Sequence, residues 1–338
     1  METLNIGIIG SGFVAEIHAE CIRRFVPNAR VVACASPTGD HAATFAARHQ
    51  LPHSFTDYRA MLEKAGVDAV YVATPDQYHR APVIDALEAG CHVVVEKPMA
   101  TSQEDAEAIC AVVERTGKKF QVDFNHRWLA PYHKIKAMID AGNLGEPVIG
   151  FARKNNPILV PTSMLASWAK DSSPAWFMSS HDIDLTAWVA QQEFVSVNAR
   201  TAHRSGRPHE DMVVAIGTLS GGTITSHVVN WLTPSKERVT VITGENGVLV
   251  ADTLTADLTY YENGRIQVDW DPGEFRGVSE GDVTRFALDR KEPMLTEHEC
   301  FRDSVLAGEA RGIVTFAEGA RVVEIAENLV ADGLDRRL

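Results

Sequence analysis

The first 125 residues alternate between short apolar runs and helical patterns, and this alternation restricts the fold more than any other feature of the sequence. Five apolar runs have the length of buried strands: Leu4–Ile9, Ala29–Ala35, Ala69–Thr74, His92–Glu96 and Phe120–Asn125. The stretches with helical spacing between them are Val14–Phe25, Asp40–His49, Ala81–Ala89 and Ser102–Thr116. Strands that are apolar on both faces and alternate with helices predict a doubly wound α/β domain, a parallel sheet with helices on both sides.

The rest of the chain has a different pattern, which predicts an α+β domain. Helices are expected at Tyr132–Ala141, Ser180–Ala190, Glu297–Ala307 and Phe316–Ala331. Strands are expected from near Pro147 onward and at Val195–His203, Asp211–Leu219, Thr223–Asn230, Arg238–Thr243, Gly247–Asp252, Asp257–Glu262 and Ile266–Trp270. Turn sequences such as Gly221-Gly222 separate these strands and favour an open, mainly antiparallel sheet. We expect one domain over residues 1–124 and a second over residues 125–338.

Length and charge exclude several classes of protein. The chain has 338 residues, more than the roughly 250–300 at which a single core stops growing, so two domains are expected. Aspartate and glutamate (45) outnumber lysine and arginine (32), and the net charge of −13 argues against a nucleic-acid partner. No run of about 18 apolar residues occurs, and the N-terminus has no signal-peptide pattern, so no membrane partner is expected.

Cysteine and histidine spacing indicates neither a disulfide framework nor a metal site. The five cysteines are an odd number and form no C-x-x-C pair, so we expect reduced thiols in a cytoplasmic protein. The 13 histidines show neither H-E-x-x-H nor a cysteine-paired zinc spacing, and no metal is expected.

A glycine-rich loop follows the first strand and opens the first helix. The segment from Gly10 to Ala15 fits G-x-G-x-x-G/A in the structural context that this motif requires. Gly10 permits a tight turn, and Gly12 lets a pyrophosphate approach the backbone. Phe13 and Val14 then supply the first N–H groups of the helix. The alternative is a glycine turn without a ligand, but the position of the loop and the further strand–helix units favour dinucleotide binding.

The residue expected to read the adenosine ribose does not decide between NAD and NADP. An acidic residue about 20 positions after the loop normally accepts from the 2′-hydroxyl. Here the second strand ends in Ser36, which would not repel a 2′-phosphate, and no arginine lies beside it to bind one. Both cofactors therefore stay open.

A lysine follows the apolar strand His92–Glu96 in the sequence Glu96-Lys97-Pro98. The carboxyl ends of parallel strands face the ligand crevice of such a sheet. Lysine titrates readily when desolvated, so Lys97 is a candidate acid/base, and the alternative is an ordinary surface lysine. A cis Lys97–Pro98 bond would be one way to direct its side chain.

Together these motifs resemble the Gfo/Idh/MocA family, named for glucose–fructose oxidoreductase, inositol dehydrogenase and a rhizopine catabolism protein. The similarity lies in residues 10–15, 73–79, 89–98 and 181–184, and it covers the whole chain. It implies a Rossmann domain that binds NAD or NADP, followed by a domain with an open antiparallel sheet. It further implies sugars, polyols or their derivatives as substrates, and a homodimer or homotetramer paired through the outer face of that sheet.

The resemblance also implies roles for individual residues. Thr74, Pro75, His79 and Glu96 would contact the cofactor. Lys97 would contact the reacting hydroxyl, and His181 matches the second catalytic position. Hydride loss from a carbinol carbon requires the hydroxyl proton to leave as well. We assign proton removal to His181 and polarisation of the oxygen to Lys97, and the sequence is compatible with the reverse.

One position departs from the family pattern. The family often has an aspartate four residues before the histidine, where this chain has Phe177. This puts the usual Asp–His arrangement and an inositol-type substrate in doubt. Asp184 shares a helical face with His181 and is a candidate replacement, with a structural carboxylate as the alternative.

Weaker candidates for substrate contact lie elsewhere. Arg153 and Asn155 follow the strand near Val148, and Asn125 lies at the domain junction. Trp168 and Trp176 flank an irregular stretch, and their rings suit either sugar C–H surfaces or a core or lid.

Three functions remain compatible with these features. The first is an NAD(P)-dependent dehydrogenase or reductase acting on a secondary alcohol or ketone. The second is a redox-neutral glycosidase of the same family that uses Lys97 and His181. The third is a non-enzymatic dinucleotide-binding sensor, which the presence of both residues disfavours.

Overall fold

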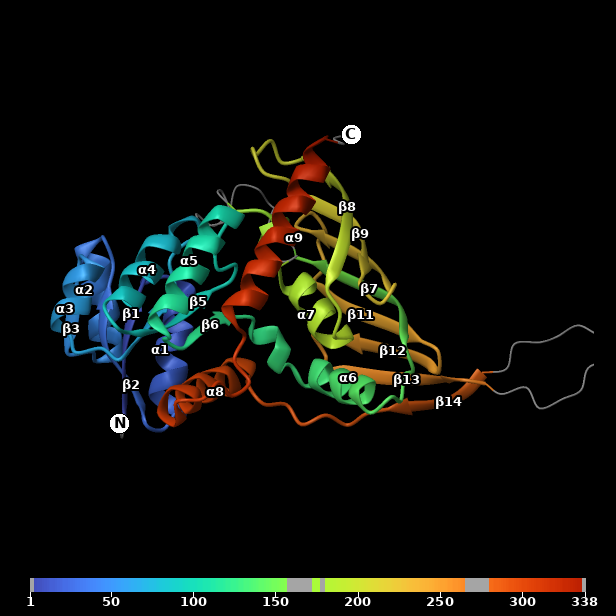
Figure 1. Cartoon of the computed structure of the whole chain (residues 1–338), viewed down its shortest axis with the longest axis horizontal. Coiled ribbons are helices and arrows are strands. Elements are labelled where there is room, and N and C mark those ends of the chain that lie inside the picture. Colours follow the sequence, from blue (N-terminus) through green and yellow to red (C-terminus); the bar gives the residue numbers. More distant parts are fainter. Residues whose placement is uncertain (1–2, 157–171, 177–179, 265–279, 336–338) are drawn as a thin grey trace, which may run out of the picture. The chain divides into compact units, whose positions relative to one another are not determined.

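The structure is a computed structural model, and it describes residues 3–156, 172–176, 180–264 and 280–335. The chain forms two compact units (Figure 1). The first unit comprises Met1–Trp128 and Lys291–Glu327, and the second comprises Leu129–Arg290 and Asn328–Leu338. Among the described residues, no helix combines the length and apolar character that a membrane crossing needs. All five cysteines are free thiols, in line with the sequence prediction.

The first unit contains a parallel sheet in the order β3-β2-β1-β4-β5-β6. Its strands are β1 (Leu4–Ile9), β2 (Ala29–Ala35), β3 (His53–Phe55), β4 (Ala69–Val72), β5 (His92–Glu96) and β6 (Phe120–Asp123). Its N-terminal helices are α1 (Phe13–Phe25), α2 (Gly39–His49), α3 (Tyr58–Lys64), α4 (Arg80–Glu88) and α5 (Gln103–Thr116), with short 3-10 helices η1 (Asp76–Tyr78) and η2 (Asn125–Trp128). The predicted doubly wound α/β domain is confirmed, and β3 and α3 are additions to it.

The strand order reverses between β1 and β4, and this reversal determines where a ligand can bind. Connections between parallel strands are right-handed, so the helices on the two sides of the reversal cover opposite faces of the sheet. The loops that leave β1 and β4 therefore diverge and open a crevice at their carboxyl ends. Gly10 follows β1 and Thr74 lies just beyond β4, so two predicted cofactor contacts lie at this crevice.

A segment far along the chain completes the first unit. Helix α8 (Pro293–Ala307) buries Phe301 in the core cluster that includes Ile8, and the Phe301 ring packs edge-on against Tyr71 at 5.8 Å. The backbone N–H of Val122 also donates to the carbonyl of Val314. We expected residues 125–338 to form the second domain, but Lys291–Glu327 belong to the first unit. The reason is that the apolar face of α8 packs against the core of the parallel sheet.

The second unit contains a mainly antiparallel sheet in the order β14-β13-β12-β11-β7-β10-β9-β8, in which only the β7–β10 pair is parallel among the described pairings. Its strands are β7 (Pro147–Asn155), β8 (Phe194–Ala202), β9 (Met212–Leu219), β10 (Ile224–Asn230), β11 (Glu237–Gly244), β12 (Gly247–Asp252), β13 (Asp257–Asn263) and β14 (Glu280–Arg285). The predicted sheet is confirmed, β14 is an addition, and the strand expected at Ile266–Trp270 lies outside the described residues.

The two faces of this second sheet differ in what covers them. Helices α6 (Ala130–Asp140) and α7 (Ser180–Ala190) lie against one face of the sheet (Figure 1). Their apolar side chains form a core cluster that includes Leu185 and Leu249. Helix α9 (Phe316–Asp335) ends in this unit, where the Asp332 carboxylate accepts from the backbone N–H of Ala199 at 2.6 Å. Exposed aliphatic side chains remain on the strands of the sheet: Val195, Val214, Ile216 and Ile224.

His92, at the start of β5, leads to a prediction about how the stability of the protein depends on pH. Nδ1 of His92 accepts a hydrogen bond from the backbone N–H of Lys119 at 2.9 Å, which requires an unprotonated nitrogen. Burial and the charges of Lys118 and Lys119 lower the pKa of His92 to about 4. Between this value and the ordinary value near 6.5, the unfolded chain binds the proton and the folded chain does not, so stability falls as pH falls.

We therefore expect the wild type to lose about 1 kcal/mol more than the His92→Gln variant between pH 7 and pH 5. This figure allows for solvent screening of the half-buried ring. Urea denaturation of both proteins at the two pH values measures the difference. Parallel losses in wild type and variant would show that His92 does not contribute to the pH dependence.

Candidate active site

The glycine-rich loop has the backbone geometry that a phosphate site requires. Gly10 has φ of +117°, and a Cβ there would lie 2.4 Å from the carbonyl oxygen of Ala73. A Cβ on Gly12 would meet nothing within 4 Å, so the space above the loop is open. Gly12 is the N-cap of α1 and supplies no side-chain cap, which leaves the first N–H groups of the helix available to an anion. The loop therefore fits a dinucleotide pyrophosphate.

The other predicted cofactor contacts near the loop differ in their exposure. Phe13 is 79% exposed, and Val14 is half-buried at the start of α1. At the end of β2, the buried Ser36 accepts a hydrogen bond from the Ser11 hydroxyl at 3.0 Å.

The loop after β4 contains a buried hydroxyl without a hydrogen-bond partner. Within the described parts of the chain, Oγ1 of Thr74 is buried and unpaired, and the next residue, Pro75, is exposed. A buried polar atom of this kind calls for a partner, and a bound ligand is one source of it. The loops after β1 and β4 thus both fit a bound dinucleotide.

His79 has a structural setting. Its ring nitrogens each lie 2.9 Å from a backbone carbonyl oxygen, Nδ1 from that of Pro98 and Nε2 from that of Thr74. The buried ring thus connects the loops that follow β4 and β5. Its expected contact with a cofactor stays a prediction.

Lys97 follows β5, as the sequence indicated. It is half-buried, and the peptide bond between Lys97 and Pro98 is cis. Its backbone N–H donates to Oε2 of Glu96 at 3.3 Å. The expected contact of Glu96 with a cofactor also stays a prediction, and its carboxylate contacts His18 as well as the backbone of Lys97.

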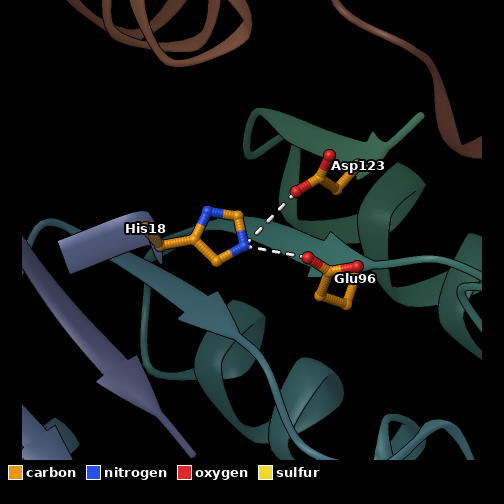
Figure 2. Close-up of side chains that lie close together, drawn as sticks. All are labelled: His18, Glu96 and Asp123. Atoms are coloured by element: carbon orange, nitrogen blue, oxygen red, sulfur yellow. Dashed lines mark hydrogen bonds and ion pairs between the residues drawn. The ribbon is translucent and has the colours of Figure 1, made fainter. Parts of the chain in front are cut away.

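Glu96 belongs to a buried group that we call the His18 cluster: His18, Glu96, Asp123, Glu297 and His298. Nε2 of His18 lies 3.0 Å from Oε1 of Glu96 and 3.3 Å from Oδ2 of Asp123 (Figure 2). Nδ1 of His18 lies 3.3 Å from Nε2 of His298. These side chains come from α1, β5, β6 and α8, so the first unit brings together residues that are distant in sequence.

Burial and mutual charge shift the pKa values within the His18 cluster. Burial disfavours protonation of His18, but its bond to Glu96 and the charges of Asp123 and Glu96 raise its pKa above the ordinary value. Burial raises the pKa of Asp123 to about 6, and the charge of Glu96 adds to this shift. Burial and then the charge of Asp123 raise the pKa of Glu297 well above its ordinary value.

The second unit carries the other predicted catalytic residue. His181 is buried in the first turn of α7, and Asp184 is buried three residues later on the same helix. The hydroxyl of Ser180 donates to the carbonyl of Trp176 at 2.8 Å, which fixes the entry to this helix. The suggested replacement of the family aspartate by Asp184 stays a prediction, and Phe177 lies outside the described residues.

A buried ion pair holds the same turn of α7 to the sheet. Nζ of Lys154 on β7 lies 2.5 Å from Oδ1 of Asp182, and each side chain is only 2% exposed. Asp182 directly follows His181 in the helix. The pair therefore determines where the first turn of α7 sits on its own sheet.

The weaker substrate candidates have varied settings. Asn155 is buried, and its side-chain amide donates to Glu237 while its side-chain carbonyl accepts from Asn230. Arg153 is exposed, and its guanidinium packs over Phe151. Asn125, at the start of η2, and Trp176 are half-buried, and Trp168 lies outside the described residues.

The sequence analysis missed the His18 cluster and the Lys154–Asp182 pair. One signal was present for the first, because His18 lies four residues from both Val14 and Ile22 on the apolar stripe of its helix. A histidine on such a stripe is buried and needs a polar partner. Nothing in the local sequence shows that the partner of Lys154 is Asp182.

Family models match both parts of the chain. A model described as an oxidoreductase family with an NAD-binding Rossmann fold matches residues 4–124. The model of the GFO/IDH/MocA C-terminal domain matches residues 132–250.

Individual proteins agree with these matches. Inositol 2-dehydrogenase 3 of Saccharopolyspora erythraea is 32% identical over 230 residues, which cover 66% of this chain and 65% of that relative. A levoglucosan dehydrogenase solved in complex with NADH has the same fold, with a TM-score of 0.85, 22% identity, and coverage of 99% of this chain and 98% of that one. A scyllo-inositol dehydrogenase from Lactobacillus casei, solved with NAD(H) and scyllo-inositol, has a TM-score of 0.80, 24% identity, and coverage of 99% and 98%. The chain belongs to the Gfo/Idh/MocA oxidoreductase family, with an NAD-binding Rossmann fold in its N-terminal part.

Proposed function

We propose that the protein is an NAD(P)-dependent oxidoreductase that transfers a hydride between the nicotinamide and a secondary alcohol or ketone of a sugar, polyol or sugar derivative. The observation that carries this proposal is the juxtaposition, within one sheet, of a phosphate-compatible loop after β1 and a lysine at the end of β5. The inositol dehydrogenase relative supports a polyhydroxylated substrate. The five free thiols support a reducing, cytoplasmic compartment.

The proposed chemistry assigns a role to each of several residues. The backbone of the loop from Gly10 to Val14 would hold the pyrophosphate, and Thr74 would offer its hydroxyl to the bound cofactor. The nicotinamide, when bound, supplies the hydride acceptor. The ammonium of Lys97 would orient and polarise the substrate oxygen, and the imidazole of His181 would accept the hydroxyl proton.

The remaining predicted contacts belong to substrate binding. Arg153, Asn155 and Asp184 offer hydrogen-bonding groups in the second unit, and Asn125 offers an amide after β6. The rings of Trp168 and Trp176 suit the C–H faces of a sugar. The exact substrate and the carbon that is oxidised would follow from the assay below.

A substrate panel tests the proposal. The protein is mixed with sugars, polyols and sugar acids, with NAD and NADP in separate wells, and reduced-nicotinamide absorbance is followed. Signal with at least one compound is the expected result, and the active wells identify the substrate class. Cleavage of a glycoside without net NAD(P)H production would replace the proposal by the redox-neutral glycosidase. Cofactor binding with neither activity would replace it by the sensor.

The setting of Ser36 gives a prediction about cofactor choice. An aspartate at this position would accept from the ribose 2′-hydroxyl of NAD and repel the 2′-phosphate of NADP. We expect Ser36→Asp to raise the ratio of kcat/KM with NAD to kcat/KM with NADP by about tenfold or more. Ser36→Asn, which is similar in size but neutral, is the control. An unchanged ratio in the aspartate variant would place the ribose elsewhere.

We also propose that the exposed aliphatic residues of the second sheet form a subunit interface. Ile216 and Ile224 lie on the neighbouring strands β9 and β10 and are 56% and 53% exposed. A patch of such residues marks a surface that another protein covers. Pairing of two copies through this sheet agrees with the homodimer or homotetramer that the family resemblance implies.

Substitution in this patch should change the oligomeric state. We expect Ile216→Lys to lower the mass measured by size-exclusion chromatography with light scattering from that of a dimer or tetramer towards that of smaller species. Leu254→Lys, an exposed apolar position in the turn after β12, is the control and should keep the wild-type mass. A wild-type protein that is monomeric would contradict the proposed interface.

A further inference from the structure

The His18 cluster contains more buried acidic groups than its surroundings neutralise. Glu96, Asp123 and Glu297 lie together, and Asp123 and Glu297 are almost completely buried. In the described parts of the chain, Glu96 and Asp123 form ion pairs with His18, and the charge of Lys97 also acts on Glu96. The ordinary way to bury several carboxylates is to pair them with cations, but the charges that act on Asp123 and Glu297 are mostly those of neighbouring carboxylates.

Several polar atoms of the cluster also lack a hydrogen bond. Both oxygens of Glu297 and Oδ1 of Asp123 are buried without a hydrogen-bond partner among the described residues, and Oδ2 of Asp123 has its ion pair with His18. The two carboxyl groups are close enough to interact directly, and two carboxylates that meet in this way require a shared proton or a cation. Buried carboxylate oxygens that lack hydrogen-bond partners indicate a place where an ion can bind.

The donor atoms have the spacing of a metal site. One nitrogen or oxygen from each of His18, Glu96 and Asp123 lies within 4.8 Å of the other two. The distances of 3.0 Å and 3.3 Å from Nε2 of His18 are near the roughly 3.3 Å between neighbouring ligands of a tetrahedral ion with bonds of about 2.0–2.1 Å. In the described ranges, no other group of three or more such side chains meets this criterion.

The surroundings of His18 match those of a metal-binding histidine. Such a histidine generally uses its second ring nitrogen to donate to a neighbouring acceptor, which fixes the tautomer and the ring orientation. Here Nδ1 of His18 lies 3.3 Å from Nε2 of His298. This placement lets Nδ1 of His18 donate to Nε2 of His298 while Nε2 of His18 faces the carboxylates.

We propose that the His18 cluster binds one divalent transition-metal ion, such as Zn²⁺, through Nε2 of His18, Oε1 of Glu96 and Oδ2 of Asp123. Imidazole and carboxylate together form a donor set that suits zinc. Glu297 lies beside Asp123 and provides a further carboxylate next to the ion. The ion replaces the proton that His18 shares with the two carboxylates, and it joins α1 to the ends of β5 and β6.

The proposed ion is separate from the hydride-transfer chemistry. Glu96 directly precedes Lys97 and accepts its backbone N–H, so the ion would fix the strand end that presents Lys97. No step of the proposed reaction passes through it. Zinc binding can therefore be measured whether or not the protein turns over a sugar or polyol.

The test measures metal binding and stability on the full-length protein. Protein stripped with a chelator is dialysed against ZnCl₂, and bound zinc is counted by elemental analysis. We expect one tightly held ion per chain and a rise in Tm of roughly 5 °C near 100 times Kd. X-ray absorption of the bound zinc should show one imidazole among oxygen donors.

Two variants localise the ion, and a third controls for other histidines. Asp123→Asn keeps the shape of the side chain, and both it and His18→Gln should lose the bound zinc and the shift in Tm. His49→Gln removes another buried histidine that is paired with a glutamate, Glu16, in the same unit, and it should keep both. Zinc that persists in Asp123→Asn, absorption spectra with sulfur ligands, or a wild type that binds no zinc would each overturn the proposal. If a variant fails to fold, the zinc content and the X-ray absorption spectrum of the wild type still test the proposal.

Discussion

Replacing Lys97 with alanine should lower kcat/KM by about 10²- to 10⁴-fold while leaving dinucleotide binding within a few-fold of wild type. A positioned group that orients the oxygen and takes part in proton transfer contributes an effect of this size, which corresponds to about 3 to 5 kcal/mol of transition-state stabilisation. Cofactor binding should survive because the loop from Gly10 to Val14 belongs to a different strand end. The backbone N–H of residue 97 can still donate to Glu96 after the substitution.

Steady-state kinetics and titration of NADH fluorescence separate the two effects. The matched control is Lys64→Ala, which removes an exposed lysine at the end of α3 in the same unit and should leave both quantities unchanged. Turnover near the wild-type level in Lys97→Ala would refute the assignment of Lys97. It would leave His181 as the group to which the proton chemistry belongs.

The first unit shows how much of a fold can be predicted from one sequence. Strands β1, β2, β4 and β5 are mainly apolar, and β6 combines the apolar Phe120 and Val122 with two buried polar residues. All five were predicted from short apolar segments, which are typical of strands that are buried on both faces. Strand β3 has only three residues, His53–Phe55, and none of them is fully buried. A strand so short has no detectable pattern, because its order comes from pairing with β2.

The packing of α8 and the existence of β14 were not predicted, because both depend on contacts with distant parts of the chain. The apolar spacing of α8 shows that it is amphipathic, but no local pattern shows which core Phe301 joins. The polar edge strand β14, from Glu280 to Arg285, is held by pairing with β13 and has no apolar alternation of its own. Both depend on contacts between segments that are far apart in the sequence.

The residues of the candidate site also fall into those that local sequence predicts and those that only the fold brings together. Gly10, Gly12 and Lys97 belong to contiguous motifs whose chemistry can be read from residue order alone. The His18 cluster draws single residues from four elements, so its existence depends on the completed fold. Asp182 directly follows His181 in the sequence, and only the structure shows that it pairs with Lys154 on β7.

Removing one member of that ion pair should destabilise the second unit strongly. Lys154→Met would leave Asp182 buried without its cation, and the loss of one partner of a buried pair costs about 3 to 5 kcal/mol. The loss should be smaller at acid pH. Burial, the largest cause, holds the pKa of His227 below its ordinary value, and the charge of Asp182 opposes that of Lys154, so removal of Lys154 should raise the pKa of this imidazole beside Asp182.

Urea unfolding followed by tryptophan fluorescence measures the effect, because five of the six tryptophans belong to the second unit. The double variant Lys154→Met with Asp182→Leu should recover most of the loss, since replacing both charges with apolar groups of similar volume is often neutral. Lys136→Met breaks a more exposed pair with Asp140 on α6 and should cost less than about 1 kcal/mol. If Lys154→Met costs no more than this control, the pair does not anchor α7. If the double variant restores stability but not turnover, the charge of the pair itself serves the neighbouring His181.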